Sequence, residues 1–143
     1  MNNYKSKVLF AAFLSVLCCA IILLIFFLQT QKPVFFVEKT SIQKSGAIFY
    51  LYNKSVFELT LGEEYCIQKK EKNAWYDLEQ LQHDEIWPLY SIVIKPKEST
   101  FFKIDWTNRY GALPAGKYRI VKKFGRSSRL QKSYNIYCEF EIL

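Results

Sequence analysis

The sequence is poor in the residues that most enzymes use for chemistry. It has one histidine, His83, and four cysteines, two of which lie inside an apolar segment near the N-terminus. A Ser-His-Asp or Cys-His mechanism would therefore depend entirely on His83. His83, Asp84 and Glu85 are adjacent, so in an extended chain they point in different directions, and no second histidine completes a metal site. We interpret this group as a solvated loop and expect a protein that is not an enzyme, with no metal site and no cofactor.

Glycine and proline are also scarce, with five and four residues. No glycine-rich loop that could cradle a phosphate group occurs. The basic residues are not arranged on a helical recognition motif, so we expect no nucleic-acid partner.

Charge is missing from one long segment, Val8 to Leu28, which directly follows Lys5 and Lys7. A helix needs about 20 apolar residues to cross the hydrocarbon core of a bilayer, and Ser15 is the only clearly polar residue here. Under the positive-inside rule, the preceding lysines favour a cytoplasmic N-terminus. We therefore expect a cytoplasmic tail over residues 1–7, a transmembrane signal anchor over 8–28, a linker over 29–33 and an extracytoplasmic domain over 34–143.

The alternative is a cleaved signal peptide. Its apolar stretch is normally about 7–15 residues long and ends at small residues in an A-x-A-like site. The run here is longer, and the sequence Leu28-Gln29-Thr30-Gln31-Lys32 that follows it offers no such site. We therefore favour an anchor that stays on the protein.

Beyond residue 33 the sequence reads as short strands separated by turn signals. Segments that are β-prone or alternate between apolar and polar residues cover 34–37, 47–52, 57–61, 65–69, 91–95, 100–106, 118–122 and 133–143, and Trp75-Tyr76 follows a polar turn. We expect Gly62 to break the strand over 57–61 and residues 78–90 to form an irregular excursion. Seven or eight such strands predict an all-β domain built as an antiparallel β-sandwich.

Two cysteines, Cys66 and Cys138, fall inside the predicted domain. If Tyr65 and Ile67 face the core, Cys66 faces out, whereas Cys138 shares the inward face of its strand with Phe140. Side chains that point in opposite directions cannot form a disulfide without moving the backbone. We therefore do not expect this pair to be bridged.

Basic residues gather late in the chain, with seven and no acidic residue between positions 117 and 132. A basic face attracts polyanions or anionic lipid headgroups, although a solvated strand and loop would have the same composition. Three aromatic residues in predicted loops could extend such a surface. The candidate binding surface is therefore Lys117, Arg119, Lys122, Lys123, Arg126, Arg129, Lys132, Trp87, Tyr90 and Tyr110.

A longer pattern runs from Ile94-Lys95-Pro96-Lys97-Glu98-Ser99 through Phe102-Lys103-Ile104-Asp105-Trp106. It continues as Tyr110-Gly111-Ala112-Leu113-Pro114-Ala115-Gly116-Lys117-Tyr118-Arg119-Ile120-Val121-Lys122. This resembles a bacterial Ig-like domain family of Firmicute envelope and membrane proteins, whose members share the ending Tyr-Gly-x-Leu-Pro-x-Gly-x-Tyr-Arg-Ile-Val-Lys. The resemblance covers residues 44–143 and departs from the family at Lys97, where glycine is usual, and at Ala74, where lysine is usual.

The resemblance implies an Ig-like β-sandwich and no reaction. It implies structural roles for the motif residues, which are Trp75, Trp106, Tyr110, Gly111, Leu113, Pro114, Gly116, Tyr118, Arg119, Ile120, Val121 and Lys122.

The sequence as a whole predicts a non-catalytic, membrane-anchored interaction or structural module at the bacterial cell envelope. Its expected partners are the membrane and either an anionic envelope polymer, lipid headgroups or a membrane protein. A different class of function stays open, an accessory or regulatory subunit of a membrane protein complex recruited through the transmembrane helix. Small residues that suit helix packing in lipid are present for that role: Ala11, Ala12, Ser15, Cys18, Cys19 and Ala20.

Overall fold

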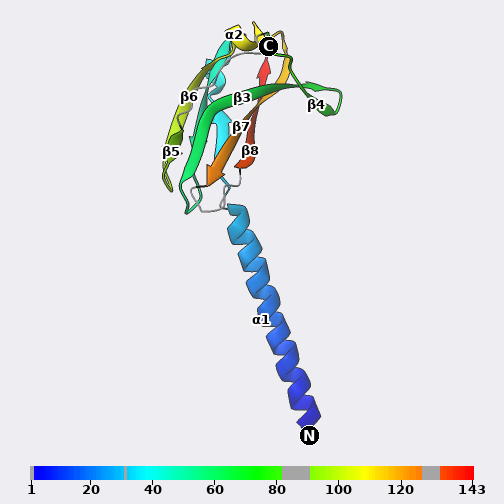
Figure 1. The fold of residues 1–143 in the computed structure, drawn as a ribbon. Coiled ribbons are helices and arrows are strands. Elements are labelled where there is room, and N and C mark those ends of the chain that lie inside the picture. The colour runs from blue at the N-terminus through cyan, green and yellow to red at the C-terminus, as the bar shows by residue number, and fades with distance from the viewer. Residues whose placement is uncertain (1, 31, 82–90, 127–132) are drawn as a thin grey trace. The chain divides into compact units, whose positions relative to one another are not determined.

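A computed structural model of the chain describes residues 2–30, 32–81, 91–126 and 133–143 (Figure 1). The chain divides into two compact units, Met1–Lys32 and Pro33–Leu143. The first unit is a single helix and the second is a β domain.

The first unit is the helix α1 (Asn2–Thr30), which extends past the predicted segment at both ends. Its stretch Lys7–Ile25 is long and apolar enough to cross a membrane. The described side chains of α1 are exposed on every side of the helix. A helix that is apolar all round needs an apolar environment, so α1 is compatible with a membrane anchor or a signal sequence.

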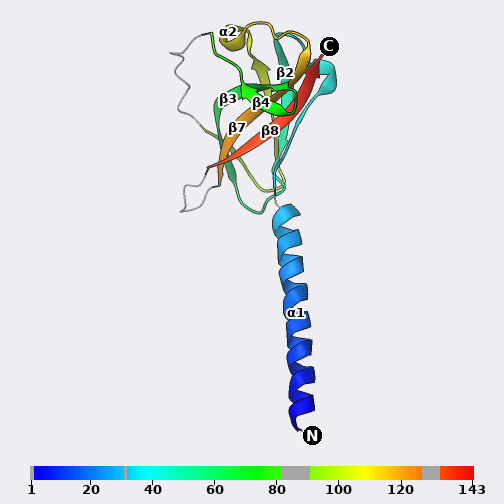
Figure 2. The same ribbon diagram turned by 90° about the vertical axis from the view of Figure 1, so that its right-hand side faces the viewer.

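The second unit consists of antiparallel strands in two sheets (Figures 1 and 2). Sheet A has the strand order β1 (Val34–Val37), β2 (Gly46–Tyr52) and β6 (Ser99–Asp105). Sheet B has the order β4 (Ala74–Asp77), β3 (Leu59–Glu71), β7 (Gly116–Arg126) and β8 (Ser133–Ile142), and β5 (Ile92–Ile94) also pairs with β3. Two short helical turns are added, η1 (Lys39–Ser41) and α2 (Thr107–Tyr110). The described residues thus form eight strands, and the predicted all-β sandwich is confirmed.

Side-chain alternation places the core between the two sheets. On β2, for example, Ala47, Phe49 and Leu51 are buried and the residues between them are half-buried. The ring of Phe140 on β8 lies 5.8 Å from Phe49, 5.3 Å from Trp106 and 5.8 Å from Tyr118 between ring centroids. Phe140 therefore joins the inner faces of both sheets, where aromatic contacts add to the burial of apolar area.

The prediction that Gly62 breaks a strand is wrong. β3 runs from Leu59 to Glu71 and pairs with β7 on both sides of an irregularity between Leu61 and Tyr65. The strand continues because β7 offers a long, unbroken partner, and a bulge absorbs the local mismatch. The strand also begins at Leu59 and not at residue 57.

The two cysteines of the domain lie on opposite faces of sheet B, as parity predicted. Cys66 stands opposite Val121 of β7, whereas Cys138 stands opposite Ile120, the residue just before Val121. Cys138 is buried, Cys66 is half-buried, and both are free thiols. The expected absence of a bridge between these two residues follows from this register.

The segment Tyr110 to Tyr118 forms a tight connection between α2 and β7. Gly111 has φ = 73°, a left-handed conformation that favours glycine, and its N–H donates to the carbonyl oxygen of Thr107 at 2.8 Å to close α2. The Tyr118 hydroxyl donates to the Pro114 carbonyl at 2.8 Å. In these contacts Gly111, Pro114 and Tyr118 hold the connection together.

Candidate interaction surfaces

No metal site is found in the part of the chain that the structure describes, where no group of three or more His, Cys, Asp or Glu could hold an ion. His83, Asp84 and Glu85 lie outside the described residues, as do the candidate surface residues Trp87, Tyr90, Arg129 and Lys132. Arg126 belongs to β7. The described side chains of the candidate surface are those of Lys117, Arg119, Lys122, Lys123 and Tyr110.

Strand parity divides the basic residues of β7 between two faces. Lys117, Arg119 and Lys123 lie on the outer face of sheet B, and Lys117 and Lys123 are exposed. Lys122 points inward with 2% of its surface exposed. The prediction that Lys122 lies on a basic surface is therefore wrong, because adjacent residues of a strand point to opposite faces.

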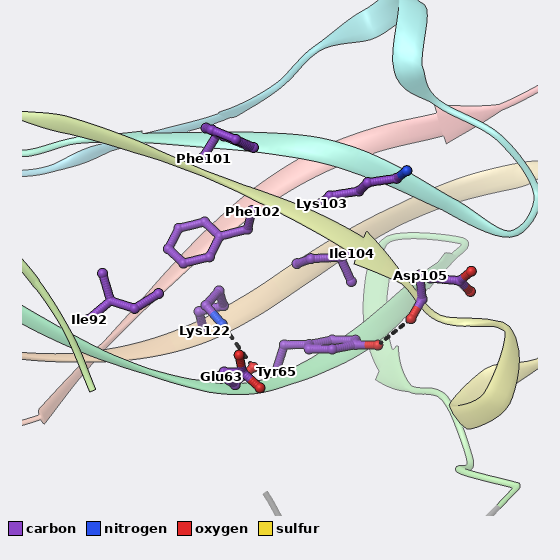
Figure 3. Close-up of a pocket in the computed structure, with 9 residues that line it drawn as sticks. All are labelled: Glu63, Tyr65, Ile92, Phe101, Phe102, Lys103, Ile104, Asp105 and Lys122. Atoms are coloured by element: carbon purple, nitrogen blue, oxygen red, sulfur yellow. Dashed lines mark hydrogen bonds between the residues drawn. The ribbon is translucent and has the colours of Figure 1, made fainter. Parts of the chain in front are cut away.

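The ammonium group of Lys122 is held by backbone carbonyls. Its Nζ donates to the carbonyl oxygens of Glu63 at 2.9 Å and Glu64 at 3.3 Å, in the irregular part of β3 (Figure 3). It also lies 5.0 Å from the ring centroid of Phe102. Burial lowers the pKa of Lys122 to about 8, although the nearby charges of Glu63 and Glu64 oppose this shift.

The outer face of sheet B carries charges of both signs. The Arg119 guanidinium lies 4.6 Å from the ring centroid of Trp75 and 5.0 Å from that of Tyr137, and its Nε donates to Gln68 Oε1. In register, Lys117 stands opposite Glu141, and Arg119 stands opposite Glu139. This face is therefore mixed, and the described part of the basic run does not form a uniformly positive patch.

Tyr110 is also misplaced by the sequence prediction, because only 9% of it is exposed. Its hydroxyl accepts hydrogen bonds from the Ile67 N–H at 3.3 Å and from Gln80 Nε2 at 3.5 Å. Burial raises the pKa of Tyr110. The short helix α2 places this side chain against β3, where it is part of the core.

A surface that the sequence prediction missed lies on the outer face of sheet A. Phe36, Tyr50 and Phe101 stand in register across β1, β2 and β6, with ring centroids 5.5 Å and 6.2 Å apart. Phe36 is 47% exposed and Phe101 is 64% exposed. We call these three residues the aromatic row.

The aromatic row could have been found from two dipeptides in the sequence. Phe35-Phe36 and Phe101-Phe102 each place two phenylalanines side by side in a strand, so one of each pair must face outward. Phe35 and Phe102 face the core, which leaves Phe36 and Phe101 outside.

A pocket of about 320 Å³ opens between the two sheets beside β6 (Figure 3). Its walls come from β6 on one sheet and from β3, β5 and β7 on the other. The lining mixes apolar and charged side chains, among them Tyr65, Ile92, Phe102, Ile104 and Lys122. The pocket therefore combines apolar volume with one buried ammonium group.

Comparison with known proteins agrees with this architecture. A family model described as a bacterial Ig-like domain matches residues 29–141, which is most of the chain. No curated protein and no solved structure gives a significant match.

Proposed function

Because the chain belongs to the bacterial Ig-like domain family, we propose that it is a non-catalytic interaction module held at the cell membrane by its N-terminal helix. Domains of this family are generally non-enzymatic, and the fold alone names no ligand.

The aromatic row is the observation that carries this proposal. Its rings pack against one another across three strands, and Phe36 and Phe101 stay largely exposed to solvent. Val34 of β1 is also exposed on this face. Exposed apolar clusters of this kind mark interaction surfaces on soluble domains, and aromatic residues are enriched at interfaces.

The proposed orientation places the N-terminus in the cytoplasm and the Ig-like domain outside it. Lys5 and Lys7 precede the uncharged run Val8 to Leu28, and under the positive-inside rule they favour this orientation. Three residues separate α1 from β1, and the chain across them reaches at most about 14 Å. A partner of the domain is therefore expected at the membrane or in the envelope layer next to it.

Lys117 and Lys123 are described, exposed basic residues of β7 that could contact an anionic envelope polymer or lipid headgroups. Glu141 stands opposite Lys117 and weakens the local positive potential, whereas Asn135 stands opposite Lys123. We therefore place the aromatic row first and this pair second.

A role as an accessory subunit, recruited through α1, is the competing proposal. It is supported by the small residues Ala11, Ala12 and Ser15, which are exposed on the helix together with Cys18 and Cys19. Such residues allow close approach of a second helix in lipid.

Cross-linking in cells, followed by gentle solubilisation and capture of the tagged full-length protein, separates these proposals. The row variant Phe36→Ser/Phe101→Ser should lose the cross-linked partner, whereas exchange of α1 for an unrelated apolar helix should retain it. The matched control Tyr76→Ser/Val93→Ser changes two side chains that are equally exposed but lie on sheet B, and it should behave like the wild type.

The opposite pattern would reject the leading proposal. A partner lost on helix exchange but kept by the row variant identifies an accessory subunit. Loss only in a Lys117→Glu/Lys123→Glu variant, with a strong dependence on salt, identifies an anionic partner.

A further inference from the structure

The two sheets of the domain have unequal width. Sheet A has three strands and sheet B has five, counting β5. Within the described ranges, β6 pairs with β2 alone, so it is an edge strand of sheet A. The pocket described above lies beside this strand, because residues 101–105 of β6 line it (Figure 3).

Two hydrogen bonds at the ends of the β2–β6 ladder reveal which backbone groups of β6 are free to bind a strand. The Asn53 N–H donates to the Glu98 carbonyl, and the Trp106 N–H donates to the Ser45 carbonyl, each at 2.9 Å. In an antiparallel ladder the bonded pairs alternate, so even-numbered residues of β6 bond to β2. The N–H and C=O groups of Phe101 and Lys103 therefore point away from β2.

The same alternation directs the backbone of Asp105 toward the pocket. Its carbonyl oxygen accepts a hydrogen bond from the Tyr65 hydroxyl at 3.4 Å, and Tyr65 belongs to the opposite wall (Figure 3). The backbone groups of β6 that point away from β2 therefore lie at the opening of the pocket.

Among the described residues, the carboxylates of Glu63 and Glu64 lie near enough to influence Lys122, but neither forms an ion pair with it. The two hydrogen bonds of Lys122 go to neutral carbonyl groups. A buried ammonium without an ion pair is unfavourable, and a carboxylate placed beside it would relieve this cost. An ammonium group has three N–H donors, so one remains for such a ligand.

We propose that β6 and this pocket bind an extended segment of a partner protein, which adds a fourth strand to sheet A and places a carboxylate beside Lys122. This inference rests on the proposed function as an interaction module and names the chemistry of one partner. An extended polypeptide fits because its backbone repeats donors and acceptors every two residues, as the free edge of β6 does.

A second copy of the chain fits the pocket poorly. Two β6 strands could pair edge to edge, but the side chains that β6 turns inward are Thr100, Phe102 and Ile104. None of these carries a carboxylate, and Phe102 and Ile104 already pack in their own domain. Pairing of two β6 strands therefore brings no carboxylate to Lys122, whereas a partner segment of different sequence can do so.

The geometry also predicts the pattern of the bound segment. Its inward residues should be apolar around one Glu or Asp, because the pocket combines apolar walls with Lys122. Its outward residue beside Phe101 should be apolar or aromatic, because it would extend the aromatic row by one strand.

The test uses the full-length protein in detergent micelles and the capped heptapeptide Thr-Val-Phe-Glu-Phe-Val-Thr as the probe, in which Val, Glu and Val share one face and the Phe on either side of Glu lies on the other. Amide hydrogen exchange should slow at Phe101 and Lys103 when the peptide is added, while Phe102, already bonded to β2, should change little. A peptide with Gln in place of Glu should bind about tenfold more weakly. A peptide with N-methyl groups along one edge should not bind.

Matched protein variants identify the two contacts separately. Lys103→Pro removes an N–H that points away from β2, so it should abolish binding with the β2–β6 ladder intact, and Lys103→Ala, which keeps the N–H, should bind normally. Lys122→Met should lower the affinity for the Glu peptide to that of the Gln peptide. The affinity for the Gln peptide should stay unchanged.

Three results would overturn the proposal. They are exchange protection outside β6, binding that Lys103→Pro does not affect, and protection of Phe101 and Lys103 that rises with protein concentration without peptide, which indicates a second copy. Because the row variant tests the proposed function separately, a partner captured through the aromatic row would leave that function standing even if the edge of β6 binds nothing.

Discussion

Lys122 is a buried charge whose position follows from strand parity and whose environment follows from the irregularity of β3. The bulge brings the carbonyl groups of Glu63 and Glu64 to its Nζ, and these groups replace part of the lost hydration. The pKa of Lys122 falls to about 8 because burial penalises the charged form. The residue thus destabilises the domain while it is protonated, and it positions a charge in the pocket.

The free energy of unfolding should depend on pH differently in the wild type and in Lys122→Met. The unfolded chain keeps its proton up to about pH 10.5 and the folded protein loses it near pH 8, so unfolding takes up a proton between these values. The wild type should therefore gain up to about 3 kcal/mol of stability across this window relative to the variant. Denaturant unfolding at several pH values measures this, and parallel curves for the two proteins would contradict it.

Asn53 joins three segments of the domain although it lies at the end of β2. Its Nδ2 donates to the carbonyl groups of Phe57 at 2.8 Å, Ile94 at 3.0 Å and Lys95 at 3.1 Å. Its Oδ1 accepts from the N–H of Ser55 at 2.9 Å and from the Ser55 hydroxyl at 2.7 Å. The side chain is fully buried, and so are its hydrogen bonds to the Ile94 carbonyl and to Ser55.

We expect Asn53→Ala to destabilise the domain by about 3 kcal/mol, because it leaves several buried polar groups unsatisfied. The control Asn135→Ala changes an exposed residue of β8 and should change the free energy of unfolding by less than about 0.5 kcal/mol. Both values come from denaturant unfolding. Equal effects would show that Asn53 does not join these segments.

At the scale of strands, Gly46 and Gly62 differ in the space that the structure leaves for a side chain. A Cβ at Gly46 would lie 2.5 Å from the carbonyl oxygen of Ile104, so β2 and β6 approach there more closely than any other residue allows. At Gly62 the nearest atom would be 3.9 Å away, which leaves room for a side chain. Composition treats the two residues alike, and only the pairing of strands distinguishes them.

Gly46→Ala should therefore separate β2 from β6 and destabilise the domain by about 2 kcal/mol. Gly62→Ala should be neutral or stabilise it by up to about 1 kcal/mol, because alanine restricts the unfolded chain. Thermal and denaturant unfolding of both variants measure the difference. A large loss in Gly62→Ala would mean that the bulge in β3 depends on glycine after all.

At the scale of the whole molecule, the proposed membrane anchor can be tested by where each end of the chain lies. The proposed orientation predicts that α1 remains in the membrane pellet after alkaline extraction. Protease added to intact spheroplasts should remove a C-terminal tag and leave an N-terminal tag protected. Release of the domain into the medium at its native size would instead indicate a cleaved signal sequence.

The sequence alone determined the features that depend on local periodicity. A long apolar run predicted the helix, and alternation predicted most strands and the opposite orientation of Cys66 and Cys138, because side-chain direction in a strand is set residue by residue. Tertiary structure decided which face each strand covers and which edge stays open. Those outcomes depend on pairings between distant segments, such as β2 with β6, and these pairings buried Lys122 and Tyr110 while leaving Phe36 and Phe101 exposed.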